Sequence, residues 1–260
     1  MKQHTTYWDA QRYDQKHAFV AEYGKGLIEW LAPQDGERVL DLGCGTGHLT
    51  HEIARAGCET VGLDASGEMV ERARSAFPNL HFEVGDATRF DFEQPFDAIF
   101  SNATLHWVLD YQAAIQHMFN HLRPGGRLVL EMGGAGNVEQ IISHLRIALQ
   151  NRGYTGQSKV QLWFFPTVGK YTSALEAAGF QVKLAQCYDR STLLQSSTYG
   201  VVDWLDMFAG AFFKGIPEAE ATAIKEQVQE AVRPYLFRDG QWYADYKRLR
   251  VAALRPLPVG

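Results

Sequence analysis

The sequence lacks the features that mark several large classes of protein. Its three cysteines (Cys44, Cys58 and Cys187) include no CxxC pair and are odd in number, which argues against a disulfide framework or a zinc knuckle. Its nine histidines show no HExxH-like spacing, so we expect no metal site. No apolar run is long enough to span a bilayer, because the most apolar stretch, residues 201–213, is interrupted by two aspartates.

The chain also carries no excess of positive charge. Its 25 Lys and Arg residues against 30 Asp and Glu residues give a net charge of -5. That balance provides no general attraction to nucleic acid or to an anionic membrane, so we expect neither as a partner. The first six residues lack the apolar core of a signal peptide. Together with the cysteine usage, these absences favour a cytoplasmic protein.

What is present is a regular alternation of short apolar runs and amphipathic helices between residues 36 and 150. Strands such as 39–42 and 128–130 are apolar at successive positions, which is expected when helices cover both faces of a parallel sheet. The pattern predicts an α/β fold with a doubly wound sheet. Ligands of such folds bind beyond the carboxyl ends of the strands.

The apolar runs and the later helices divide the 260 residues into four parts. The predicted strands are 38–42, 60–63, 80–84, 96–100, 127–132, 180–187 and 249–254. Two helices, at 201–212 and 224–236, are expected to form an insertion that folds over the sheet as a lid. The expected parts are an amino-terminal helical segment (1–35), a core (36–195), a helical lid insertion (196–240) and a last strand that returns to the core (241–260).

The most informative segment is the strand and loop from Val39 to Gly47. The strand runs into three glycines, Gly43, Gly45 and Gly47, and then into a helix. Glycine lets the backbone turn sharply and lets a ligand approach closely, and the amide groups at the helix start point toward that ligand. Taken alone, this is a weak signal for a nucleotide loop.

Two neighbouring residues narrow the choice of ligand. A dinucleotide fingerprint G-x-G-x-x-G would need its third glycine where His48 stands. Asp41, at the end of the strand, would repel a pyrophosphate and would attract a ligand that carries an ammonium and a sulfonium group. S-adenosylmethionine (SAM) is such a ligand.

Acidic residues follow the next two predicted strands. Asp64 closes the second strand, 64 − 41 = 23 residues after Asp41, where a carboxylate can accept both ribose hydroxyls; the alternative is that it caps the helix that begins near Ser66. Asp86 follows the third strand and can accept from an adenine amino group while the Ala87 amide donates to a ring nitrogen. As an isolated turn, this segment would mean little, since Asp is common in turns.

Taken in order, these motifs resemble those of the class I SAM-dependent methyltransferases. The segments that carry the resemblance are Val39–Gly47, Asp64, Gly85–Ala87, Phe96–Asn102 and Leu122–Leu128, and together they extend over about half the chain. Within that superfamily, Ser101–Trp107 and the region of Tyr13 and His17 look like the trans-aconitate methyltransferase-like group. The resemblance implies a seven-stranded Rossmann-like sheet with an antiparallel last strand, and SAM as the cofactor. It does not identify the acceptor.

The candidate catalytic residue is His106, directly after the fourth strand, as a base or as a group that orients the acceptor; the alternative is a histidine that packs in a loop. Methyl transfer from a sulfonium mainly requires positioning and the exclusion of water, and a base matters only if the acceptor atom carries a proton. The expected cofactor-binding residues are Asp41, Gly43, Cys44, Gly45, Gly47, Asp64, Ala65, Asp86, Ala87, Asn102, Tyr13 and His17. The expected substrate-pocket residues are Trp107, Trp204, Phe208 and Phe212, although such aromatic stripes are usually core.

The leading hypothesis is a SAM-dependent methyltransferase that acts on a small molecule, with a carboxylic acid as one candidate acceptor. Arg190, Lys214, Arg233 and Arg238 could serve an acidic substrate, and solvated surface charge is the alternative for each. A non-catalytic SAM-binding module, an NAD-type oxidoreductase on the same fold and a methylene transfer to lipid remain as other interpretations. The acidic charge balance disfavours the lipid reaction. The oligomeric state is left open.

Overall fold

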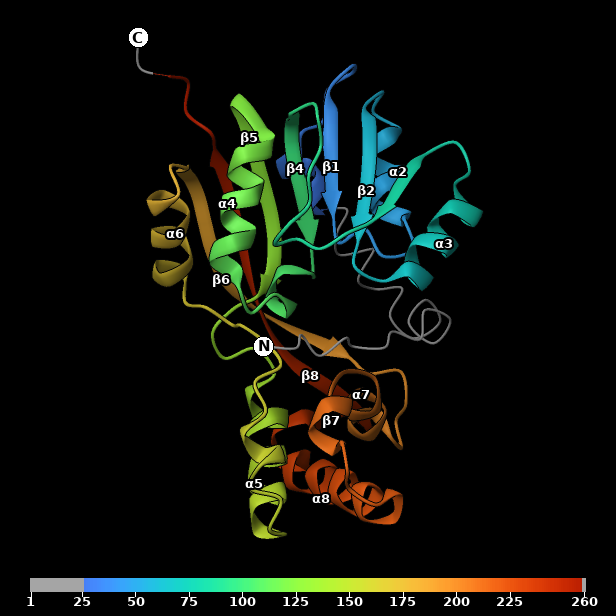
Figure 1. The fold of residues 1–260 in the computed structure, drawn as a ribbon. Helices are drawn as coiled ribbons and strands as arrows, with labels where there is room; N and C mark the ends of the chain where they lie inside the picture. Colours follow the sequence, from blue (N-terminus) through green and yellow to red (C-terminus); the bar gives the residue numbers. More distant parts are fainter. Residues whose placement is uncertain (1–25, 259–260) are drawn as a thin grey trace. The chain divides into compact units, whose positions relative to one another are not determined.

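The computed structural model describes residues 26–258, which form two compact units (Figure 1). The first, which we call the sheet unit, contains the described residues 26–134, 166–187 and 249–258. The second, which we call the helical unit, contains residues 135–165 and 188–248. Among residues 26–258, no helix is both long and apolar enough to cross a membrane.

The sheet unit contains the parallel part of the sheet. Its first five strands are β1 (Arg38–Leu42), β2 (Glu59–Asp64), β3 (His81–Val84), β4 (Phe96–Asn102) and β5 (Leu122–Gly133). Parallel pairing joins β3 to β2, β2 to β1, β1 to β4 and β4 to β5. The strand order is β3-β2-β1-β4-β5-β8-β6, so the direction of winding reverses between β1 and β4. In open α/β sheets, ligands bind at the carboxyl ends of the strands at such a reversal.

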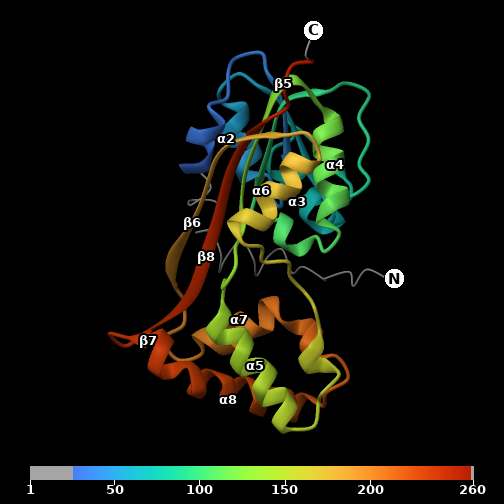
Figure 2. The same ribbon diagram turned by 90° about the vertical axis from the view of Figure 1, so that its left-hand side faces the viewer.

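Helices cover both faces of this sheet. Besides the helical residues 26–31, the described helices of the sheet unit are α2 (His48–Ala54), α3 (Gly67–Ala76), α4 (Tyr111–His121) and α6 (Val168–Ala177), with a single turn, η1 (Leu105–Trp107), after β4. Figure 2 shows α2 and α4 on opposite sides of the strands. On one face, Ile53 of α2 and the helical residues Leu27 and Leu31 pack on the strand residues Val39 and Phe100, and all five are fully buried. The predicted doubly wound α/β fold is therefore confirmed.

Two long strands run through both units. They are β6 (Gln181–Leu193) and β8 (Gln241–Leu254), and the short β7 (Phe237–Arg238) pairs with β8 in antiparallel fashion. The sequence predicted shorter strands at 180–187 and 249–254, and it predicted no β7. The added segments alternate in burial instead of being apolar at every position, so no continuous apolar run in the sequence marks them. The described sheet thus has eight strands where seven were predicted.

The helical unit gathers helices from both parts of the chain that it contains. They are α5 (Glu139–Asn151), α7 (Gly200–Phe208) and α8 (Glu218–Leu236), with the single turns η2 (Gln157–Lys159) and η3 (Gly210–Phe213). Both α5 and α7 pack on α8. The expected core range 36–195 included the α5 segment, whereas the structure groups α5 with α7 and α8. The expected division at 196–240 and the closure of a lid over the sheet stay predictions.

One helix is shorter than predicted. The sequence suggested that Trp204, Phe208 and Phe212 lie on one helix, but α7 ends at Phe208 and Phe212 lies in η3. Ala209 separates the two elements, and η3 begins at Gly210, a residue that favours the end of a helix. The three aromatic side chains therefore do not form one helical stripe.

Candidate functional site

The glycine loop joins the carboxyl end of β1 to α2. Gly43, Gly45 and Gly47 all have positive φ angles, of 82°, 54° and 84°, which residues other than glycine rarely adopt. The amides of Gly43 and Cys44 donate to the carbonyl of Leu63, at 2.6 and 3.1 Å. The loop is therefore fixed against the end of β2.

The three glycines face different surroundings. A Cβ atom at Gly43 would lie 2.0 Å from Thr104 Oγ1, and one at Gly47 would lie 2.8 Å from the Phe82 ring. A Cβ atom at Gly45 would have no described heavy atom within 4 Å. Packing therefore demands glycine at the outer two positions, whereas the backbone at Gly45 borders a space that a ligand can use.

Asp41 is more enclosed than the sequence suggested. It is 2% exposed, and its Oδ2 accepts a 2.6 Å hydrogen bond from the Thr50 hydroxyl of α2. Burial raises the pKa of Asp41 to about 7, the Thr50 hydrogen bond opposes that rise, and the nearby charge of Asp64 adds to it. The carboxylate is thus held under the loop, and its charge near neutral pH depends on pH.

Asp64 ends β2 beside the glycine loop. Its Oδ2 accepts from the Gly45 amide at 2.9 Å, and its Oδ1 accepts from the Ser66 amide at 2.8 Å, at the start of α3. Burial raises the pKa of Asp64, while hydrogen bonds from the Ser66, Gly45 and Ala65 amides lower it. Each carboxylate oxygen has a second lone pair, so capping the helix and accepting a ligand hydroxyl are compatible. The predicted neighbours Asp64, Ala65 and Gly45 do meet in space.

The turn after β3 contains Asp86 and Ala87. Asp86 Oδ1 accepts from the Thr88 amide at 2.9 Å and from the Thr88 hydroxyl at 2.8 Å, which is the ordinary arrangement of an aspartate in a turn. Ala87 is buried, and Arg89 lies 3.5 Å from Asp86 Oδ2. The adenine contact expected of this turn stays a prediction.

The end of β4 is joined directly to the glycine loop. Asn102 is buried there, and the Thr104 hydroxyl lies 3.1 Å from its carbonyl and 3.2 Å from the carbonyl of Gly43. The Ser101 hydroxyl donates to the backbone carbonyl of Leu42 at 2.8 Å. These contacts bring Asn102 close to the turn predicted to bind the cofactor.

His106 lies in η1, just beyond the same strand end. The ring is 7% exposed, and its Nδ1 accepts from the Gly133 amide at 3.4 Å, at the end of β5. Because Nδ1 faces a donor, a neutral ring carries its proton on Nε2. The His106 and Trp107 ring centroids are 5.6 Å apart. Both residues therefore belong to the carboxyl edge of the sheet, as predicted.

Cys44 is in the loop but is unsuited to act as a nucleophile. Its side chain is buried, and burial together with the charges of Asp41 and Asp64 raises the pKa of the thiol. The thiolate is the reactive form, and this setting disfavours it. Within residues 26–258, no group of three or more His, Cys, Asp or Glu side chains could hold a metal ion.

Sequence reasoning missed an ion pair near the same strand ends. Glu131 of β5, which pairs in register with Asn102, is 1% exposed, and its Oε2 accepts from Arg250 of β8 at 2.9 and 2.7 Å. The Arg250 guanidinium also lies 5.2 Å from the centroid of the Trp30 ring. The available signal was a charged residue next to an apolar run in each of two strands, Glu131 after Leu128–Leu130 and Arg250 before Val251–Leu254, 119 residues apart.

The predicted substrate-pocket aromatics other than Trp107 lie in the helical unit. Trp204 and Phe212 are buried, and both rings lie near Trp163, at centroid distances of 6.1 and 6.0 Å. Phe208 is only half-buried, 5.2 Å from Trp204. Phe212 therefore has the environment of a core residue, whereas Phe208 retains some exposure.

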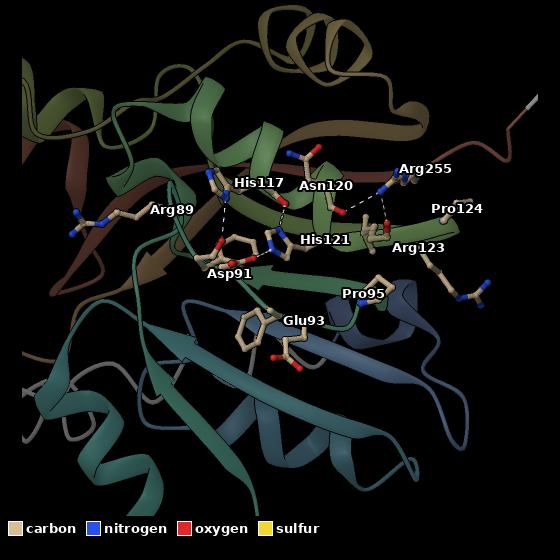
Figure 3. A pocket seen from close by; sticks show the side chains of 13 residues that line it. Arg89, Asp91, Glu93, Pro95, His117, Asn120, His121, Arg123, Pro124 and Arg255 are labelled. Carbon is tan, nitrogen blue, oxygen red and sulfur yellow. Dashed lines mark hydrogen bonds and ion pairs between the residues drawn. The ribbon is translucent and has the colours of Figure 1, made fainter.

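A separate hollow of about 710 Å³ lies at the opposite, amino-terminal ends of β4 and β5 (Figure 3). Its polar groups are mostly paired with one another: His121 Nε2 lies 3.3 Å from Asp91, and Arg255 donates to the carbonyls of Phe119, Asn120 and Leu122. None of the residues predicted to form the site lines this hollow. It is therefore distinct from the candidate site.

Comparison with known proteins identifies the class. A family model for a methyltransferase domain matches residues 33–178, which is more than half of the chain. The protein therefore belongs to the methyltransferase domain family, and it is a SAM-dependent methyltransferase. This result decides against the NAD-type oxidoreductase.

Individual relatives show which methyltransferases this chain is similar to in sequence. An uncharacterized methyltransferase of Schizosaccharomyces pombe is 34% identical over 258 residues, which cover 95% of this chain and 97% of the relative. A trans-aconitate 2-methyltransferase of Enterobacter sp. is 30% identical over 204 residues, or 76% of this chain and 77% of the relative. A trans-aconitate 2-methyltransferase of Methylobacterium radiotolerans is 40% identical over 119 residues, or 44% and 46% of the two chains. The resemblance to trans-aconitate methyltransferases is thereby confirmed.

A solved structure agrees on the fold. The S-adenosylmethionine-dependent methyltransferase from Mesorhizobium loti superposes with a TM-score of 0.54 at 22% identity and covers 90% of this chain and 98% of its own. The open space at Gly45, bordered by the carboxylate of Asp64, fits SAM, whose ribose hydroxyls need an acceptor.

Proposed function

We propose that the enzyme transfers a methyl group from SAM to a carboxylate oxygen of a small organic acid. The observation that carries this proposal is the 30% identity, over 76% of the chain, to an enzyme named for the methylation of trans-aconitate. The acceptor is therefore a small molecule in this proposal, and neither a nucleic acid nor a membrane lipid.

The proposed chemistry needs positioning more than it needs proton transfer. SAM supplies a methyl group that is already activated by its bond to a positively charged sulfur. A lone pair of the acceptor carboxylate forms the new O–C bond, and the electrons of the broken C–S bond stay on sulfur. A carboxylate is ionised at neutral pH, so no proton has to be removed. The site must align the two reactants and exclude water.

His106 suits this task as a group that orients the acceptor. Its Nδ1 accepts from Gly133, so a neutral ring carries its proton on Nε2, where it is a donor, and Nδ1 has no lone pair left with which to act as a base. A donor is what a carboxylate oxygen requires. Of the two roles open to His106 from the sequence, the orienting role is the one we propose.

The cofactor contacts follow from the strand ends. We propose that Asp64 accepts from the ribose hydroxyls, and that Asp86 and the Ala87 amide contact the adenine. The backbone at Gly45 lies against the ligand, and Asn102 contacts the methionine portion. Tyr13 and His17, predicted to close the site, lie outside the described residues.

The test is a transfer assay with SAM labelled in its methyl group. The acceptors are trans-aconitate, related mono-, di- and tricarboxylates, and amines, phenols and thiols of similar size. We expect label only in products that alkali hydrolyses, as methyl esters do. Label in an amine, phenol or thiol, with none in any acid, would contradict the proposal.

The role of His106 has its own measurement. His106→Ala should lower kcat/KM for the acid by roughly 10–100-fold, the cost of about 1.5–3 kcal/mol for a hydrogen bond to a charged group. His106→Asn, which keeps a hydrogen-bond donor, should retain more of the wild-type kcat/KM than His106→Ala does. His81→Ala, at an exposed position, is the control. A base role would instead predict no recovery in the asparagine variant.

A further inference from the structure

The turn that carries His106 leaves the sheet through a strained residue. Ala103, directly after β4, has a φ angle of 57°, in the left-handed region that a residue with a Cβ atom seldom occupies. Such a conformation costs free energy and persists only where the surrounding structure holds it. Contacts from two sides hold Ala103 and the turn η1 that follows it.

One set of contacts comes from β5. The Ala103 amide donates to the carbonyl of Glu131 at 2.8 Å, and the Gly133 amide donates to His106 Nδ1 at 3.4 Å. Both hydrogen bonds tie the turn to the end of the same neighbouring strand. They do not themselves reach the glycine loop, where the cofactor is expected.

The contact with the glycine loop comes from Thr104, which directly precedes η1. Its hydroxyl lies 3.2 Å from the carbonyl of Gly43 and 3.1 Å from that of Asn102, and its single proton can be donated to either. The side chain also packs on Gly43, because a Cβ atom there would lie 2.2 Å from Thr104 Cγ2. The Gly43 amide in turn donates to the carbonyl of Leu63 at 2.6 Å. Thr104 therefore joins the turn of His106 to a fixed point of the loop.

We propose that Thr104 is a positioning residue, whose hydrogen bond to Gly43 sets the place of His106 relative to the bound cofactor. This inference rests on the proposed role of His106 in orienting the acceptor. His106 follows Thr104 by two residues within one short turn, so a shift at Thr104 is passed on to the ring. Methyl transfer requires the acceptor atom to be aligned with the methyl group, and a small displacement impairs that alignment. Thr104 acts through His106 and touches neither reactant.

The test compares variants of the full-length enzyme that separate the hydroxyl from the shape of the side chain. Thr104→Val keeps the shape and removes the hydroxyl, so it should lower kcat/KM for the acid roughly 3–10-fold, the effect of one lost hydrogen bond. Thr104→Ser keeps the hydroxyl and should stay within about twofold of the wild type, because the bond to Gly43 is retained. The affinity for S-adenosylhomocysteine should remain that of the wild type in both variants.

A double-mutant cycle tests whether Thr104 acts through His106. In the His106→Ala background, Thr104→Val should cause little further loss, because the group that Thr104 positions is gone. The same fractional loss of kcat/KM in both backgrounds would contradict the proposal, since a merely structural role does not depend on His106. The matched control is Thr172→Val on α6, whose hydroxyl also donates to a nearby carbonyl, that of Gly169 at 3.3 Å. It should leave kcat/KM unchanged.

Residue-resolved hydrogen exchange, measured without any acceptor, separates this inference from the proposed function. The Trp107 and Val108 amides donate to the carbonyls of Thr104 and Leu105. In Thr104→Val these two amides should exchange roughly 3–10-fold faster than in the wild type, and in Thr104→Ser they should not. The Phe77 amide, which donates to Ala73 at the end of α3, is the control and should not change.

Faster exchange in Thr104→Val alone supports the positioning role even if no acid is methylated, a result that would refute only the proposed function. Unchanged exchange of both amides in folded Thr104→Val would overturn the inference and leave carboxylate methylation standing. If Thr104→Val does not fold, as a loss of cooperative thermal unfolding would show, Thr104→Ala takes its place in each comparison.

Discussion

Two aspartates at the ends of neighbouring strands show how position decides the role of a residue. Asp64 is half-buried and bonded to backbone amides on both sides, with lone pairs left for a ligand. Asp41 is almost completely enclosed and bonded to Thr50. The sequence treated both as ligand-facing carboxylates, and only the structure distinguishes the open one from the enclosed one.

Asp64→Ala should weaken the binding of S-adenosylhomocysteine by about 10–100-fold, since hydrogen bonds to a charged group contribute about 1.5–3 kcal/mol. Isothermal titration calorimetry measures this affinity. Asp91→Ala, which changes an almost fully exposed carboxylate of the same unit, is the control. An unchanged affinity in folded Asp64→Ala would remove Asp64 from the ribose site.

The raised pKa of Asp41 predicts that the free energy of unfolding depends on pH. Its pKa is 3.8 in a model peptide and about 7 in the folded chain, so the folded state holds the proton more tightly. The free energy of unfolding should therefore fall as pH rises from about 4 through 7. Asp41→Asn keeps an acceptor for Thr50 and removes the buried charge. We expect Asp41→Asn to raise Tm at both pH values, with a gain at pH 8 that exceeds the gain at pH 5 by roughly 4–8 °C. Equal gains at both pH values in thermal melts would show that the carboxyl does not titrate in this range.

At the scale of the element, the glycine loop separates packing from ligand binding. Gly45→Ala and Gly47→Ala both impose a positive φ on an alanine, of 54° and 84°, so both variants carry backbone strain. At Gly47 the new methyl group would meet Phe82 at 2.8 Å, whereas at Gly45 it would enter open space.

We therefore expect Gly47→Ala to lower Tm by roughly 2–4 °C more than Gly45→Ala, for about 1 kcal/mol of additional cost. Gly45→Ala should instead weaken S-adenosylhomocysteine binding about tenfold. Thermal melts and calorimetry on the two variants make the comparison. The opposite pattern, with stability lost at Gly45 and affinity kept, would exclude the ligand from that space.

The elements themselves were predictable where a local pattern is strong. The apolar runs of β1 to β5 and the helical periodicity of α3 and α4 placed these elements correctly, because strands buried on both faces and amphipathic helices carry their own signal. The sequence did not predict the extensions of β6 and β8, because buried and more exposed residues alternate there and no continuous apolar run marks the strands. Phe212 was placed on the wrong element, because helical spacing alone does not locate the end of a helix.

At the scale of the whole molecule, the ion pair of Glu131 with Arg250 ties the last long strand to the centre of the sheet. Its carboxylate is fully buried and its partner lies 119 residues away. Removing one member of a buried pair leaves an uncompensated charge, which costs about 3–5 kcal/mol.

Glu131→Ala should accordingly lower the free energy of unfolding by about 3–5 kcal/mol in denaturant titrations. Replacing both residues, Glu131→Met with Arg250→Met, should recover most of the lost free energy of unfolding. Glu71→Ala breaks an exposed pair with Arg74 and should cost less than about 1 kcal/mol. A loss in Glu131→Ala as small as that of the control would mean that the pair does not stabilise the fold.

The sequence by itself determined the fold class, the cofactor and the segments that gather at the carboxyl edge of the sheet. These properties follow from local rules: glycines where the chain must turn, acids at strand ends and periodic burial. Only the tertiary structure decided which glycine leaves room for a ligand, which aspartate is enclosed, and that Glu131 meets Arg250. Those outcomes depend on contacts between residues far apart in the chain, and the order of the strands, which no local pattern encodes, brings those residues together.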